Sequence, residues 1–223
     1  MSYADIDRAV RRTGMFCRGG FHPAPGDDLD GTATVILVGN AGPAFWQSAA
    51  PNLPETRHPL DDWTRAILTP IAEECGAQIA FPFDGPPYHP FQQWAQRSEP
   101  VFPAPIGPLI HPEFGLWHAY RAAFLLSARI ELPARGGAAS PCDSCADRPC
   151  LATCPVGAFG AAGYDVPKCV DHIERPEGAD CLELGCRARR ACPVGADFLY
   201  PPGQARHHMA AFIAAQRIAT RKA

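Results

Sequence analysis

The feature that most constrains this chain is a dense run of cysteines toward its C-terminal end. Two short runs each finish with Cys-Pro, and each of these units opens the same pentapeptide, Cys-Pro-Val-Gly-Ala, at residues 154–158 and 192–196. A five-residue identity that closes two cysteine runs is an internal repeat, and it predicts two equivalent sites related by approximate twofold symmetry. The eight cysteines of this region are Cys142, Cys145, Cys150, Cys154, Cys169, Cys181, Cys186 and Cys192.

The spacing of these cysteines indicates iron–sulfur ligation. A cubane 4Fe–4S cluster needs four thiolates from short loops, and in two-cluster ferredoxins the cysteine before proline ligates the other cluster. Applied to the repeat, this rule gives one set of Cys142, Cys145, Cys150 and Cys192 and a second of Cys154, Cys169, Cys181 and Cys186. The spacing is longer than in the simplest ferredoxins, so the pairing depends on the repeat, whereas the set of eight does not.

Two other kinds of site use several cysteines. An even cysteine count suits a disulfide framework, and Cys142-x2-Cys145 could be half of an all-thiolate zinc site. The chain shows no secretory segment, and a terminal Cys-Pro unit is unusual at zinc, so iron–sulfur ligation is the preferred interpretation. Cys17 and Cys75 lie far from this region and are expected to be half-buried thiols without a ligand role.

Composition limits the class of protein. Apolar residues make up 47% of the chain and charged residues 19%, which suits a globular protein with a real core. The formal net charge of −3 gives no support to a nucleic-acid partner. No apolar run approaches the ~20 residues that span a bilayer. Reduced thiols favour the cytoplasm, so we expect a cytoplasmic protein with neither a nucleic-acid nor a membrane partner.

Periodicity and turn residues divide the rest of the chain into elements. A buried strand is expected at 34–38, a second strand at 77–83 and a third at 118–127, where a strand is preferred over a helix. A Gly/Pro/Asp loop is expected between residue 12 and Gly31. Helices are expected at 3–12, at 58–74 with a kink or break at Pro70, at 90–98 and at 204–220. The small-residue stretch at 135–140 is the expected domain boundary.

The segment Ile-His-Pro-Glu-Phe-Gly-Leu-Trp at residues 110–117, with Gly107 before it, carries a resemblance. It resembles a segment shared by epoxyqueuosine reductases, reductive dehalogenases and cobalamin-processing proteins of the cblC type. The cysteine module is also similar to that of epoxyqueuosine reductases, in which a Cys-Pro run is followed by a lone cysteine and a second Cys-Pro run.

This resemblance implies an α+β fold. Its parts would be a nitroreductase-like α/β sheet domain at residues 1–134, a small two-cluster ferredoxin-like domain at 141–200 and a C-terminal helix at 203–223. It also implies a corrinoid (cobalamin) bound by the first domain and contacted by His111, Phe114, Gly115 and Trp117. The alternative for His111 is that it caps the strand through a backbone hydrogen bond.

The implied function is an oxidoreductase that passes electrons through two 4Fe–4S clusters to the corrinoid, for cobalamin processing or for reduction of a substrate. A flavodoxin or a ferredoxin reductase would donate the electrons, steered by Arg187, Arg189 and Arg190 if these do not simply form a solvated turn. No catalytic residue is identified. The alternative function is a ferredoxin-type carrier whose N-terminal domain is a docking module without a corrinoid.

Overall fold

A computed structural model describes residues 1–220, and side chains to residue 218. The chain forms two compact units. We call residues 1–101 with 118–139 the sheet unit, and residues 102–117 with the chain from Ser140 onward the cysteine unit. Residues 221–223, the end of the expected C-terminal helix segment, lie outside the described residues.

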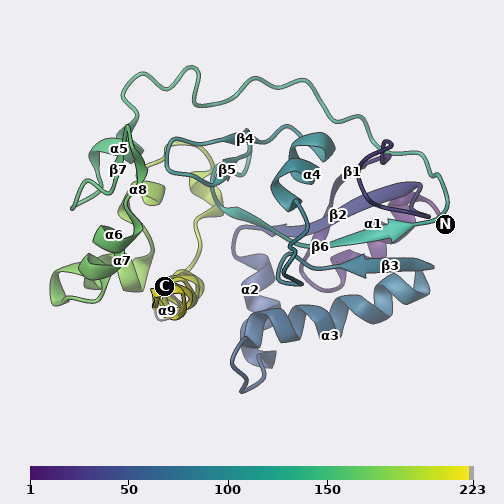
Figure 1. Ribbon diagram of the computed structural model, residues 1–223, viewed down its shortest axis with the longest axis horizontal. Coiled ribbons are helices and arrows are strands. Elements are labelled where there is room, and N and C mark those ends of the chain that lie inside the picture. The colour runs from purple at the N-terminus through teal and green to yellow at the C-terminus, as the bar shows by residue number, and fades with distance from the viewer. Residues whose placement is uncertain (221–223) are drawn as a thin grey trace. The chain divides into compact units, whose positions relative to one another are not determined.

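The sheet unit is built on a four-stranded antiparallel sheet in the order β1-β2-β6-β3 (Figure 1). β2 is central and almost wholly buried, which explains its unbroken apolar run. The three strands expected from the sequence are confirmed, but β1 falls where a loop was expected. The strands are β1 (Phe16–Phe21), β2 (Thr34–Ala41), β3 (Ala77–Ala80) and β6 (His118–Leu126).

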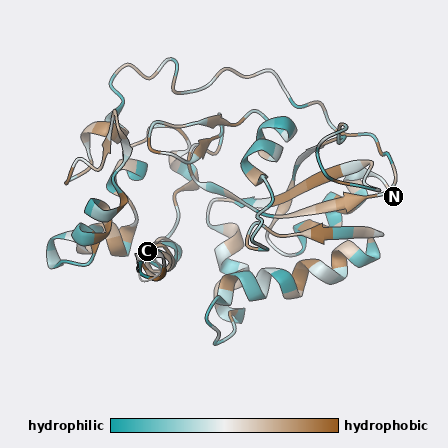
Figure 2. Ribbon diagram, in the orientation of Figure 1, coloured by the Kyte–Doolittle hydropathy of each residue, from teal (hydrophilic) through white to brown (hydrophobic). Residues whose placement is uncertain are grey.

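Helices cover both faces of this sheet. α1 (Tyr3–Arg11), α2 (Ala44–Ala49), the 3₁₀ turn η1 (Ala50–Asn52) and α3 (Pro59–Glu74) precede β3 in the chain. α1, α2 and α3 pack with Ile36, Val38 and Phe124 in one apolar core. Figure 2 shows the strands as the most hydrophobic part of this unit. α4 (Phe91–Ser98) covers the other face, where Trp94 lies 6.2 Å from Phe21, ring centroid to ring centroid. Pro70 does not divide α3, which runs through it.

The cysteine unit consists of short elements. Its longest is α9 (Pro202–Thr220), which packs against α7 and confirms the expected C-terminal helix within the described residues. The others are β4 (Phe102–Pro103), β5 (Leu109–Ile110), α5 (Pro149–Ala152), β7 (Phe159–Gly160), β8 (Gly163–Tyr164), α6 (Val166–Ile173), η2 (Pro176–Gly178), α7 (Ala179–Leu184), α8 (Arg187–Arg190) and η3 (Ala196–Phe198). β4 pairs with β5, and β7 with β8, as two small hairpins.

The architecture is α+β, as expected. One boundary differs from the expected domains: residues 102–117 belong to the cysteine unit and not with the preceding residues of the 1–134 domain. The β4–β5 hairpin and the turn after it make their contacts with the cysteine loops, and this could not be read from a local pattern. In the described part of the chain, no helix is both long and apolar enough to cross a membrane.

Candidate metal centres

Four cysteines line one cavity of the cysteine unit. Cys142, Cys145, Cys150 and Cys192 all lie in the wall of this cavity. Cys192 belongs to the second cysteine run and completes the first set, as the Cys-Pro rule predicts. The remaining wall is formed by Pro105, Ile110, Pro141, Arg148, Pro149, Pro193 and Val194.

The other four cysteines line a second cavity of similar size. Cys154, Cys169, Cys181 and Cys186 all lie in its wall. The structure therefore brings together the same two sets of four that the repeat predicts, while their ligation of iron stays a prediction. The remaining wall is formed by Pro155, Val156, Phe159, His172, Ile173, Arg187, Ala188 and Met209.

The repeated pentapeptide has a structural reason. Gly157 and Gly195 hold equivalent places in its two copies, and both have left-handed backbone angles, φ +57° and φ +76°. Only glycine adopts this conformation without strain. In the first copy the turn brings the backbone N–H of Ala158 to 3.3 Å from Cys154 Sγ, to which it donates. Backbone donors of this kind stabilise a thiolate ligand.

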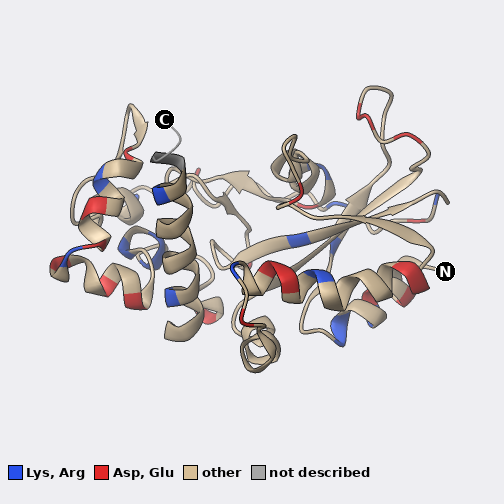
Figure 3. Ribbon diagram, turned by 60° about the horizontal axis from the view of Figure 1, so that its bottom comes forward, with Lys and Arg blue, Asp and Glu red and all other residues tan. Residues whose placement is uncertain are grey.

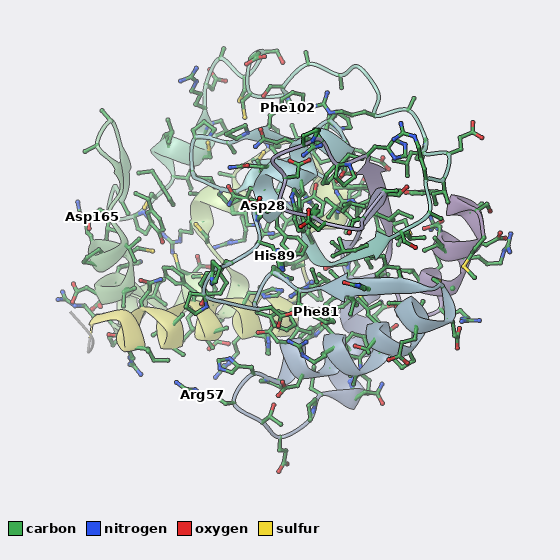
Figure 4. All side chains as sticks on the ribbon, turned by 45° about the vertical axis from the view of Figure 1, so that its right-hand side comes forward. Asp28, Arg57, Phe81, His89, Phe102 and Asp165 are labelled. Atoms are coloured by element: carbon green, nitrogen blue, oxygen red, sulfur yellow. The ribbon has the colours of Figure 1, made fainter. Side chains whose placement is uncertain are left out.

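Two short helices present cysteines of the second set. Asp165, labelled in Figure 4, caps the start of α6 by accepting a hydrogen bond from the backbone N–H of Lys168 at 3.0 Å. This cap fixes the first turn of the helix, which carries Cys169. Cys186 is the N-cap residue of α8, so its thiol lies at the start of this helix.

Electrostatics separates the cysteines into the same two groups. Burial raises the pKa of the Cys142 thiol, and the charges of Cys192 and Cys150 raise it further. Burial likewise raises the pKa of Cys186, with Cys181 and Cys154 adding to the rise. Thiolates this close repel one another, so a full set of four ionises together only when a cation compensates their charge.

The donor set fits a cluster better than a single ion or disulfides. All ten cysteines are free thiols. Around one zinc ion, Zn–S bonds of about 2.3 Å bring tetrahedral sulfurs to within about 4 Å of one another. Among residues 1–220, no group of three or more His, Cys, Asp or Glu side chains is placed to hold a metal ion in this way. The thiols enclose a space instead, which suits a group of several iron atoms.

The segment at 111–117 packs on the second copy of the pentapeptide. A Cβ added to Gly115, at φ +56°, would overlap the carbonyl oxygen of Val194, and one added to Gly195 would overlap Phe114. Ile110 and Val194 both line the first cavity. The predicted cofactor-contact segment is therefore a neighbour of the first cysteine set within the same unit.

The side chains of this segment have different surroundings. His111 Nδ1 accepts hydrogen bonds from the backbone N–H groups of Glu113 at 3.1 Å and Phe114 at 3.2 Å, and its ring stacks on Phe114 with centroids 4.3 Å apart. His111 therefore makes the backbone hydrogen bonds that the alternative, a capping role, requires. A neutral imidazole that accepts at Nδ1 carries its proton at Nε2, which leaves no lone pair for cobalt. Gly115 is buried, and Trp117 is only 2% exposed.

The arginines of α8 have partners inside the cysteine unit. Arg189 covers the Trp117 ring at 4.4 Å and donates from Nε to the carbonyl oxygen of Leu116 at 3.0 Å. Arg187 donates to Asp180 at 2.6 Å, and Arg190 pairs with the same carboxylate. Figure 3 shows acidic and basic positions interspersed on the short helices of this unit. These contacts give Arg189 a packing role that its sequence position did not suggest.

The sheet unit contains a buried polar cluster that sequence reasoning missed. The side chain of Arg18 is 0% exposed and pairs with Glu99, with Nε donating to Oε2 at 3.1 Å. Arg18 also donates to the carbonyl oxygen of Asn40 at 3.2 Å, and Tyr120 donates its hydroxyl to Glu99. Burial raises the pKa of Tyr120, which keeps it a neutral donor. These residues come from four distant segments, so no local pattern could have revealed them.

Known proteins resemble this chain in structure and not in sequence. No protein-family model matches it, and no curated protein matches it by sequence. The structure of epoxyqueuosine reductase from Streptococcus thermophilus superposes with a TM-score of 0.53 at 14% identity, covering 91% of this chain and 69% of that one. A selenomethionine-labelled epoxyqueuosine reductase gives a TM-score of 0.54 at 13% identity, covering 91% and 68%. At this identity the likeness shows the fold.

A third structure corrects one expectation. Epoxyqueuosine reductase with an epoxyqueuosine-modified tRNA-Tyr stem loop superposes with a TM-score of 0.54 at 14% identity, covering 89% of this chain and 66% of that one. A protein of this fold thus binds a nucleic acid, so the prediction that excluded such a partner is wrong. It was based on formal net charge, which averages over the whole surface and says nothing about a local binding face.

Proposed function

We propose that this protein is an iron–sulfur oxidoreductase with one 4Fe–4S cluster on each cysteine set. The observation that supports this most directly is the pair of cavities, each lined by four free thiols. The fold shared with epoxyqueuosine reductases adds support. Such clusters, when bound, accept and release single electrons at a potential set by their surroundings.

The chain's own residues would hold, insulate and bias these clusters. The proline and aliphatic walls of the first cavity, among them Ile110 and Val194, limit access of water. The backbone N–H of Ala158 donates to Cys154 Sγ. Such donors lower the negative charge at sulfur and favour the reduced state. These features suit electron transfer better than structural metal binding.

We further propose a corrinoid as the group that receives electrons from the first cluster. Support comes from the segment at 110–117, which resembles the corresponding segment of corrinoid proteins. Its Ile110 lines the first cavity, and its Gly115 packs on Val194 of the same wall. Of the four predicted contact residues, the stacked pair His111 and Phe114 is partly exposed. These two rings would contact the corrinoid by packing, with the tautomer of His111 making it a donor and not a cobalt ligand.

A modified nucleoside in RNA is the second candidate, as the final substrate. The observation that favours it is the structure of the same fold with an epoxyqueuosine-modified tRNA stem loop. This candidate is compatible with a corrinoid intermediate carrier. A simple ferredoxin-type carrier remains the alternative to both, and it predicts neither corrinoid nor RNA binding.

The first experiment measures the iron and acid-labile sulfide content of the protein. Protein purified without oxygen should contain about eight iron atoms and about eight acid-labile sulfides per chain if two cubanes form. Cys186→Ser should reduce both counts to about four, while Cys75→Ser, outside both cavities, should leave them unchanged. Bound zinc, or about four irons in the unsubstituted protein, would contradict the two-cluster proposal.

The second experiment tests the acceptor. Titration with hydroxocobalamin should change its visible spectrum, and Phe114→Ala should weaken binding while leaving the iron content intact. A matched control is Phe83→Ala, which removes the same ring from the sheet unit. Parallel titration with a labelled RNA stem loop, with and without the modified nucleoside, tests the second candidate. Binding of neither ligand would favour the carrier alternative.

A further inference from the structure

The second cavity contains an imidazole that the four thiols do not account for. His172 lies on α6, three residues after Cys169, and lines the cavity together with all four cysteines of the second set. Its Nε2 atom is buried and has no hydrogen-bond partner among the described residues. The first cavity has no histidine in its wall.

The partner of this nitrogen is expected inside the cavity. A buried N–H without an acceptor is unfavourable, and native proteins almost always pair such groups. No sulfur, oxygen or nitrogen atom of the described chain accepts from it, even though sulfur acceptors count at longer distances than oxygen. The acceptor must therefore be something that the cavity holds when the protein is complete.

A water molecule is a poor candidate for this role. A buried water needs two to four polar partners. Apart from the thiols, the polar side chains of this wall are His172 and Arg187. The Nε–H of Arg187 already donates a hydrogen bond to Asp180 at 2.6 Å. The other wall residues are apolar or proline: Pro155, Val156, Phe159, Ile173, Ala188 and Met209.

We propose that His172 Nε2–H donates a hydrogen bond to a sulfur of the cluster on the second cysteine set and raises its reduction potential. This inference rests on the proposed function. A hydrogen bond to a cluster sulfur stabilises the more negative, reduced state more than the oxidised state. His172 is thus a tuning residue, and it makes the two otherwise equivalent clusters different, with the second easier to reduce than it would be without the imidazole.

Redox titration followed by electron paramagnetic resonance tests this directly. His172→Phe should lower the midpoint potential of one cluster and leave the other unchanged, so the first cluster serves as an internal control. His172→Gln keeps an N–H at a similar reach and should restore most of the potential. His58→Phe, the same substitution at an exposed position of the sheet unit, should change neither potential.

The possible results distinguish failure of this inference from failure of the proposed two-cluster function. An iron content below about eight in the unsubstituted protein overturns the two-cluster function and the inference with it. An iron content of about eight in both proteins, with identical potentials in His172→Phe and the unsubstituted protein, overturns the inference alone.

If His172→Phe loses its second cluster, the proposal is tested on the unsubstituted protein instead. Protein labelled with ¹⁵N-histidine should show a weak ¹⁵N hyperfine coupling to the reduced cluster, and His172→Gln should remove it. Absence of coupling in the unsubstituted protein overturns the inference. A strong coupling of the kind given by an iron-bound imidazole also overturns it, because Nε2 would then be a ligand and not a donor.

Discussion

The sheet unit and the cysteine unit are each stabilised internally in a different way. The sheet unit buries a large continuous core of aliphatic and aromatic side chains from four strands and the helices that cover them. The cysteine unit has small separate groups of buried residues, and cysteines make up part of two of them. Apart from α9, its described α-helices have four to eight residues, too short to be stable by themselves. Burial explains the stability of the first unit, whereas the proposed clusters would supply much of the stability of the second.

The largest expected effect is that of metal removal. Stripping iron with a chelator under anaerobic conditions should unfold most of the cysteine unit, since the binding energy of a structural metal centre is folding energy. Hydrogen–deuterium exchange should then show loss of protection in α5 to α8, with β2 and β6 still protected. Equal loss of protection in both units would show that the sheet unit also depends on the clusters.

The reverse perturbation acts on the sheet unit alone. Glu99→Gln should lower its free energy of unfolding by about 3–5 kcal/mol, because it leaves the buried guanidinium of Arg18 without a counter-charge. Denaturant titration followed by tryptophan fluorescence measures this. The double variant Arg18→Met, Glu99→Leu should lose less, since it removes both charges. Iron content should stay at its original value, and a parallel loss of iron would argue against independent units.

A glycine pair tests how the segment at 102–117 is attached to the cysteine unit. Gly107→Ala should cost about 1 kcal/mol, the price of a left-handed residue at φ +102° with open space around it. Gly115→Ala adds a clash with Val194 and should cost roughly 2–4 kcal/mol. The rate of cluster loss in air gives a readout close to the site. Equal rates for the two variants would mean that this packing does not support the clusters.

The smallest expected effect is an acid titration in the sheet unit. The backbone N–H of Ser2 donates to the Asp5 carboxylate at 3.0 Å, and this bond, with those from the Ser2 hydroxyl and Arg8, lowers the pKa of Asp5 from 3.8 to about 2. A lowered pKa stabilises the folded state above pH 3.8, and the contribution is lost as pH falls toward 2.

Nuclear magnetic resonance titration of the Asp5 carboxyl should give its midpoint, and Asp5→Asn should remove the local acid dependence of α1. The cysteine unit should not respond to this substitution. A midpoint near that of a free aspartate would show that the capping box of α1 is not formed in solution.

The sequence was most informative about the spacing of the cysteines and about the periodicity of the apolar residues that form a core. The eight cysteines and their division into two sets followed from the Cys-Pro repeat, and the cavities reproduce that division. The apolar runs of β2 and β6 and the periodic α3 were recognisable because each buries one face or both. Pro70 was expected to kink or break this helix, and the break did not occur, because α3 continues through it to Glu74.

β1 was missed because its residues are poor strand formers in isolation. It contains Arg18, Gly19 and Gly20, and the pairing with β2 shifts register between Cys17 and Gly20. Gly19 has φ +70°, and a Cβ there would overlap the carbonyl oxygen of Ser98. The glycines that suggested a loop are in fact required for a bulged edge strand to pass close to α4.

The eight candidate thiol ligands were recognisable from local spacing, because a cluster is held by cysteines that short loops bring together. The placement of residues 102–117 with those loops depended on contacts far apart in the chain, such as Gly115 against Val194. The same holds for the buried pair of Arg18 and Glu99 and for the unpaired Nε2 of His172. Burial and hydrogen-bond pairing are properties of the packed chain, and no linear pattern specifies them.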